Sequence, residues 1–287
     1  MTAQPEKIVA LVDGSIYSAS VCDHAAWISQ RTHAPVELIH ILGRREAPEK
    51  RDLSGSIQLG ARTALLEELA ELDAQRARLI SARGRAILED ARSILDKAGV
   101  PEITTRLRQG DVVETIAEIE KDARVVMVGK RGEAADFAKG HLGSNLERII
   151  RTSTRPVFVA ARSFKPIEKV LVAYDGGTSA MKAIDHIARS PLFQGLAVQV
   201  VTVGSATPEA RKGLEDASAV LRAAGLQAST AILSGQPEAA LSRLIDEESH
   251  DLLVMGAYGH SRIRSLIIGS TTTAMIRSCK VPVVLIR

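Results

Sequence analysis

Aromatic residues are scarce in this chain of 287 residues, and other features are sparse as well. Phe, Trp and Tyr make up 3% of the sequence, which leaves few rings on which nucleic-acid bases could stack. The formal net charge is only +3, with acidic and basic residues mixed along the chain, so a dedicated nucleic-acid surface is not expected. No apolar run is long enough to cross a membrane.

Cysteine is rare, and a secretion signal is missing from the N-terminal residues. Cys22 and Cys279 lie in different halves of the chain without metal-ligand spacing, and two isolated thiols favour a reducing environment. The segment from Met1 to Lys7 is polar, and the apolar run after it is short. We therefore expect a cytoplasmic protein with no nucleic-acid partner, no membrane partner and no metal site formed by protein ligands alone.

What the sequence does contain is an alternation of short apolar runs and amphipathic segments that restarts halfway. The apolar runs predict strands at 7–12, 36–42, 103–107, 124–128, 156–160, 169–173, 196–203, 228–233, 252–255 and 281–286. The amphipathic segments predict helices at 18–31, 56–98, 111–121, 145–151, 180–189, 208–224, 236–247 and 271–278. This alternation predicts an α/β fold, with parallel sheets covered by helices on both faces.

The restart is an internal repeat. Asp13-Gly14 recurs as Asp175-Gly176 at an offset of 162, and Gly129 recurs as Gly256 at an offset of 127. The first half is thus longer in its middle, where a leucine-rich helical insert covers about 52–98. We expect one domain at 1–163 and a second at 164–287. The insert is interpreted as a helix covering its own sheet rather than a coiled coil, although its long charged face leaves an interaction role open.

Each half carries a glycine loop between its fourth strand and the next helix. In the second half Gly256-x2-Gly259 is followed, after nine intervening residues, by Gly269-Ser270. Glycine lets the backbone approach a ligand closely, and a helix N-terminus attracts anions. The spacing differs from both the Walker motif and the dinucleotide fingerprint. These loops predict phosphate binding at the carboxyl ends of the strands, unless they are only turns.

The aspartate after the first strand of each half has two interpretations. Asp13 and Asp175 lie at the same predicted sheet edge as the glycine loops, which suits contact with a ligand. The alternative interpretation is that each aspartate simply caps the helix that follows it. For the first helix, Ser15 or Ser18 is the expected N-cap.

Together these motifs resemble those of tandem universal stress proteins, over nearly all of both halves. The loop from Gly256 to Ser270 is similar to the ATP-binding pattern of the nucleotide-binding branch, and the last strand, from Val281, is also family-like. The resemblance implies two five-stranded domains with strand order 3-2-1-4-5 and an adenine nucleotide alpha hydrolase-like fold. It implies that the two domains pack as a pseudo-dimer through their last strands. A homodimer of the whole chain is also left open.

The resemblance also implies ATP or AMP as the ligand, with Mg²⁺ as an accompanying ion. Carried over by position, the second-half site comprises Ala173, Tyr174, Asp175, Val203, Met255, Gly256, Gly259, His260, Gly269, Ser270, Thr271 and Thr272. The first-half site comprises Asp13, Ile41, Gly129, Lys130, Gly132, Gly143, Ser144 and Asn145.

The two sites are expected to differ in strength. The first glycine loop is one residue longer, and Leu146 stands where Thr272 offers a hydroxyl to a γ-phosphate. The second site is therefore favoured, although Lys130 and Arg131 supply compensating charge in the first.

The function expected from these features is adenine-nucleotide binding in stress response or signalling, with at most weak ATP hydrolysis. No residue is assigned a catalytic role, because the sequence offers no evident general base and no paired carboxylates for two metal ions. Two alternatives stay open: an enzyme such as an adenylyl transferase, and an interaction module that binds no nucleotide.

Overall fold

The computed structural model describes residues 6–43, 61–130, 144–257 and 269–287. In the first half it contains β1 Lys7–Leu11, α1 Ser18–Thr32, β2 Val36–Leu42, α2 Ala61–Lys97, β3 Ile103–Gln109, α3 Val112–Ile119, β4 Ala123–Gly129, α4 Ser144–Thr152 and β5 Val157–Ala160. In the second half it contains β6 Lys169–Ala173, α5 Thr178–Arg189, β7 Ala197–Val203, α6 Pro208–Ala223, β8 Gln227–Leu233, α7 Pro237–Glu248, β9 Leu252–Gly256, α8 Ser270–Ser278 and β10 Val283–Ile286. Short 3-10 turns occupy Glu120–Asp122 and Pro191–Phe193.

The ten strands form one continuous sheet in the order β3-β2-β1-β4-β5-β10-β9-β6-β7-β8. Each half has the expected order 3-2-1-4-5, and its strands pair in parallel. The last strands of the halves pair antiparallel, with Val284 opposite Phe158. The expected pseudo-dimer is therefore one continuous sheet. Because this joint is antiparallel, the strands of the two halves run in opposite directions, and their carboxyl ends lie at opposite edges of the sheet.

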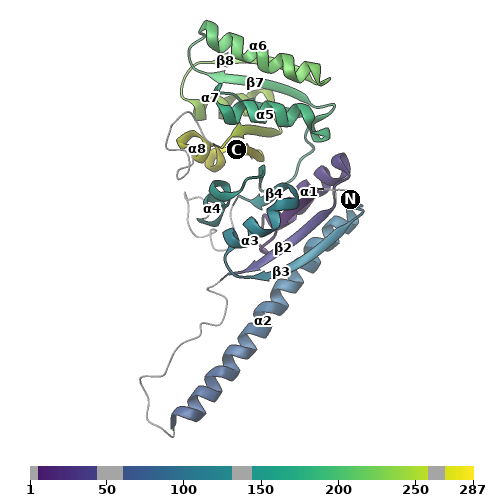
Figure 1. Cartoon of the computed structure of the whole chain (residues 1–287), viewed down its shortest axis with the longest axis vertical. Coiled ribbons are helices and arrows are strands. Elements are labelled where there is room, and N and C mark those ends of the chain that lie inside the picture. Colours follow the sequence, from purple (N-terminus) through teal and green to yellow (C-terminus); the bar gives the residue numbers. More distant parts are fainter. Residues whose placement is uncertain (1–5, 44–60, 131–143, 258–268) are drawn as a thin grey trace.

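Helices cover both faces of the sheet because side chains alternate along each strand. Val170 and Val172 face the cluster that includes residues of α1, α2, α5 and α6, whereas Leu171 faces the cluster that includes residues of α3, α4, α7 and α8. The result is a three-layered α/β arrangement (Figure 1). Inner strands such as β1 and β9 are buried, whereas the edge strands β3 and β8 are largely exposed or partly buried.

Capping at the helix starts follows the sequence only in part. Asp111 caps α3 as predicted, accepting hydrogen bonds from the amides of Val113 and Glu114. The N-cap of α1 is Tyr17, without a side-chain cap, so the prediction of a serine cap is wrong. Ser18 instead accepts a hydrogen bond from the Gly14 amide and closes the loop after β1.

The helix α2 is a single element of 37 residues, and Gly84 does not interrupt it. A Cβ at Gly84 would lie 2.7 Å from Leu107 Cδ1 and 2.9 Å from His40 Cδ2, so glycine allows the helix to approach the sheet closely. Before this point the helix extends beyond the sheet (Figure 1). The prediction that the leucine tract covers its own sheet therefore holds only for its C-terminal part.

Candidate functional site

The strand order of the second half reverses between β6 and β9. These strands are neighbours in the sheet, with Ala173 opposite Met255, while the chain leaves β6 in one direction and β9 in the other. The loop containing Asp175 and the loop that begins at Gly256 therefore leave the same edge side by side. In parallel sheets this switch point is where ligands bind.

Tyr174 belongs to the framework of this edge rather than to its open surface. The residue is 8% exposed, and its hydroxyl donates to Sδ of Met181, on α5, at 3.0 Å. Its amide donates to the Val201 carbonyl, and its own carbonyl accepts from Thr202 Oγ1 at 2.8 Å. Burial raises the pKa of the Tyr174 phenol. The sequence correctly indicated that Tyr174 lies at this sheet edge, but it did not indicate that the ring turns inward.

Three partly buried apolar residues form a platform at the carboxyl ends of β6, β7 and β8. Ala173, Val203 and Leu233 pack against the cluster beneath α7 and α8 and keep part of their surface accessible. Met255 lies deeper, at 5% exposure. Leu233 was not among the residues predicted from the sequence, although its register opposite Val203 identifies it. We call Ala173, Val203 and Leu233 the apolar platform.

Gly256 is required by packing inside the protein. A Cβ at this position would lie 2.8 Å from Ser179 Cβ and 3.3 Å from the Ala180 nitrogen, at the start of α5. No real Cβ approaches another carbon so closely without a shift of the backbone. The glycine therefore sets how closely β9 lies against α5. Ser179 carried no signal in the sequence that links it to Gly256.

The N-terminus of α8 opens at the same edge. Its N-cap is Gly269, no described side chain caps it, and its first turn contains no acidic residue. Ser270 is exposed and Thr271 is partly exposed. The first-turn amides thus have no intrahelical acceptor, and they form the positive end of the helix dipole.

Thr272 faces the interior instead. It is 4% exposed, and its hydroxyl donates to the Gly256 carbonyl at 3.4 Å. This contact fastens α8 to the end of β9. Leu146, the matching residue of the first half, is also 4% exposed. The difference between threonine and leucine at this place therefore lies inside the protein.

Both aspartates close the loops that contain them. Asp175 Oδ1 accepts from the Gly177 amide at 2.8 Å, and Asp13 Oδ1 accepts from the Ser15 amide at 3.0 Å. The N-caps are Gly177 in α5 and Tyr17 in α1, and neither helix has a side-chain cap, so the interpretation of these aspartates as helix caps is wrong.

The first-half edge differs in its charges. Ile41, at the end of β2, is partly exposed like Val203, and Gly129 ends β4. The next residue, Lys130, donates through Nζ to the Cys279 carbonyl at 2.6 Å, at the C-terminal end of α8. Asn145 is exposed near the start of α4, and Glu147 places a negative charge in that first turn.

Several predicted residues lie outside the part of the chain that the structure describes. These are Gly132 and Gly143 in the first loop and Gly259 and His260 in the second. Ser144 is described only as the first residue of α4.

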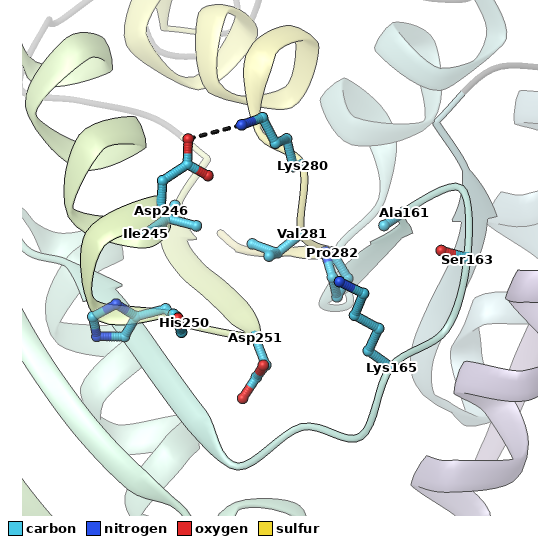
Figure 2. A pocket seen from close by; sticks show the side chains of 11 residues that line it. Ala161, Ser163, Lys165, Ile245, Asp246, His250, Asp251, Lys280, Val281 and Pro282 are labelled. Atoms are coloured by element: carbon cyan, nitrogen blue, oxygen red, sulfur yellow. Dashed lines mark hydrogen bonds and ion pairs between the residues drawn. The ribbon is translucent and has the colours of Figure 1, made fainter.

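A separate cavity of about 320 Å³ lies at the amino ends of β9 and β10. It contains none of the predicted site residues, and Figure 2 shows Lys280 joined to Asp246 on one wall, with Lys165 on another. That ion pair measures 2.8 Å, and Asp251 accepts from the amides of Glu168 and Lys169 at 3.0 Å. Both carboxylates are thus engaged in contacts within the protein. We therefore regard the switch-point edge of the second half as the stronger candidate for a ligand site.

The described residues contain no group of three His, Cys, Asp or Glu side chains placed to hold a metal ion. None of their helices combines the length and apolarity that crossing a membrane requires.

Comparison with known proteins connects both halves to one family. The model of the Universal stress protein family matches residues 5–161 and again 166–287. Universal stress protein Slr1230 of Synechocystis sp. is 37% identical over 98% of this chain and 100% of its own length. Universal stress protein Rv1996 of Mycobacterium tuberculosis is 24% identical over 98% of this chain and 94% of its own.

A solved structure shows the same fold. The universal stress protein from Archaeoglobus fulgidus DSM 4304 superposes with a TM-score of 0.72 at 21% identity, covering 98% of this chain and 96% of that one. The two matches of the family model and the likeness of the whole chain to Slr1230 agree with the repeated fold. This chain belongs to the universal stress protein family.

Proposed function

We propose that the second half binds an adenine nucleotide, ATP or AMP, at its carboxyl edge, and that binding rather than turnover is its role in stress response or signalling. The observation that carries this proposal is the meeting of two surfaces at the switch point. An uncapped helix N-terminus lies beside a partly exposed apolar platform. One surface suits a phosphate, and the other suits a flat heterocycle.

The base would lie on the apolar platform. Pockets for cofactors are lined mostly by apolar side chains, with a few polar groups that fix orientation. Ala173 and Val203 supply that lining from neighbouring strands. The carboxylate of Asp175, in the exposed loop after β6, would accept hydrogen bonds from the ribose. Contact with the base would cover apolar surface that is otherwise wet.

The phosphates would meet the N-terminus of α8. Amides without intrahelical partners point out of the first turn, and the helix dipole favours negative charge there. Ser270 adds an exposed hydroxyl. Mg²⁺ would arrive with a triphosphate and be held mainly by its oxygens, as in other nucleotide sites.

The second site is proposed to bind more tightly than the first. The first turn of α4 carries Glu147, whose charge opposes an anion, whereas the first turn of α8 carries no acid. Lys130 donates to the other half through its contact with Cys279. These charges replace the difference between Thr272 and Leu146 as the physical reason for the ranking.

The test is a charge placed at each helix start. Ser270→Glu and Asn145→Glu both change an exposed residue, and an acidic residue in a first turn does not destabilise a helix. Isothermal titration with ATP should show at least about tenfold weaker binding for Ser270→Glu, because a new charge faces the phosphates. Asn145→Glu is the matched control: it should leave the tighter, second-half binding unchanged and weaken only the binding at the first-half edge.

Two further comparisons sharpen the test. Inorganic triphosphate should bind more weakly than ATP, because it lacks the base that covers the apolar platform. Native mass spectrometry should report nucleotide bound to the parent chain and less of it on Ser270→Glu. Equal ATP affinity in the parent and in Ser270→Glu would rule out the α8 site.

A further inference from the structure

The first part of α2 forms an arm that extends away from the sheet. The arm comprises residues 61–83, about 35 Å of helix, and ends at Gly84, where the helix meets β2 and β3. Figure 1 shows this part reaching beyond all other described elements. Of the six large apolar side chains that are exposed in the described part of the chain, five lie on the arm: Leu65, Leu66, Leu69, Leu72 and Leu79. Such a concentration marks an interaction surface.

The exposed leucines form a seam along one side of the arm. Leu65, Leu72 and Leu79 follow one another at intervals of seven residues, and Leu69 lies four residues after the first. Leu72 is 54% exposed and Leu79 is 72% exposed. Alternating spacings of four and three are typical of the seam between paired helices, and Arg76 continues the pattern with a polar residue.

The charges on the arm indicate how a second helix would lie. Residues 67–73 contain only acidic charges, at Glu67, Glu68, Glu71 and Asp73. From residue 76 to residue 85 all charges are basic, at Arg76, Arg78, Arg83 and Arg85. Two copies of this helix in parallel would place acid beside acid. Two copies in antiparallel orientation about residue 72 place Glu68 of each opposite Arg76 of the other and Glu67 near Arg78, while Glu71 and Asp73 face each other at the axis.

We propose that the arm pairs antiparallel with the arm of a second copy of this chain, around a two-fold axis beside Leu72. Residue 72 is the midpoint of 61–83, so both arms are covered along their whole length. In such an isologous contact Leu65 of one copy faces Leu79 of the other. The joint between β5 and β10 is already used inside the chain, so a dimer needs a different surface.

The oligomeric state of the full chain tests the pairing. Sedimentation equilibrium should show a concentration-dependent dimer. Leu72→Glu should weaken it about 100-fold, because the change is present in both copies and puts two charges on the axis. Ala70→Glu introduces the same charge at an exposed position on the opposite side of the helix, and it should leave the dimer intact. A parent chain that is monomeric at every concentration would overturn the proposal, and so would Leu72→Glu with an unchanged dimer.

Cross-linking tests the orientation. Leu72→Cys should be joined across the axis by a short bismaleimide. Leu65→Cys alone should not be joined, because the two copies of that position lie 14 residues, about 21 Å, apart along the helices. A mixture of Leu65→Cys and Leu79→Cys chains should be joined. The native Cys22 and Cys279 are buried, and the parent chain controls for them. Cross-linking of Leu65→Cys alone would show parallel arms and refute the antiparallel pairing.

Discussion

Gly256→Ala tests whether the closeness of β9 to α5 depends on the missing side chain. The added Cβ would lie 2.8 Å from Ser179 Cβ and 3.3 Å from the Ala180 nitrogen. One neighbour is a small side chain and the other is backbone at a helix start, so neither can rotate away. Overpacking of this kind costs about 1–3 kcal/mol of the free energy of unfolding. Urea denaturation of the full chain without nucleotide should show this loss.

Ser179→Gly supplies the matched control. Alone it should cost up to about 1 kcal/mol, because glycine is a poor helix former. In the double variant the 2.8 Å contact disappears, and the total loss should be smaller than the sum of the single losses by about 1 kcal/mol. Additive losses would show that the two residues do not compete for the same space. An unfolding free energy unchanged by Gly256→Ala would refute the packing argument.

Two further predictions concern buried polar groups. His24 is fully buried between Phe158 and Phe164, and burial lowers its pKa from 6.5 to about 4. The unfolded chain therefore binds a proton at this histidine before the folded chain does. The free energy of unfolding should be highest above pH 6.5 and fall by about 3 kcal/mol as the pH drops towards 4. In His24→Leu, urea midpoints should depend less on pH across this range than in the parent, and equal slopes would contradict the assignment. Glu120 accepts from Ser153 Oγ at 2.6 Å and from the Thr154 amide at 3.1 Å, so Glu120→Ala should cost about 2–3 kcal/mol in thermal or urea unfolding, whereas the exposed control Glu118→Ala should cost little. Equal losses in these two variants would show that the buried carboxylate contributes nothing special.

Most of the sheet could be predicted from the sequence because its inner strands are buried on both faces, unlike the edge strands β3 and β8. Runs such as Leu252 to Met255 are apolar at every position, which separates them from amphipathic helices. The ends of elements were less accurate: β10 begins at Val283 rather than Val281, and β3 continues to Gln109. Such ends depend on hydrogen bonds to neighbouring strands, which local composition does not encode.

The sequence predicted which candidate residues lie at the sheet edge, but it did not predict the direction of their side chains. A residue at or just after the end of a strand must lie at the sheet edge, and the structure places Gly256 and Asp175 there. Whether Tyr174 turns inward depends on Met181, and the role of Gly256 depends on Ser179. These contacts join residues that are distant in sequence, and no local pattern announces them.

The arm of α2 illustrates a different limit. Leu65 and Leu95 belong to the same helical periodicity, yet Leu65 is 41% exposed and Leu95 is fully buried. Periodicity shows that a helix has an apolar side, but it does not show where the sheet beneath that side ends. The end of the sheet is set by the lengths of β2 and β3, so only the folded arrangement separates the covered part from the arm.

The helix α8 connects the two edges that the antiparallel joint sends to opposite sides of the sheet. Its N-terminus lies at the second-half edge, beside Gly256. At its C-terminal end the Cys279 carbonyl accepts a hydrogen bond from Lys130, which lies at the first-half edge. A cation at a helix C-terminus and an anion at its N-terminus both match the direction of the helix dipole. Lys130 therefore satisfies at one end the same dipole that a phosphate would satisfy at the other. The two halves are thus joined through this helix as well as through paired strands, and a charge at one edge acts on the element that forms the other.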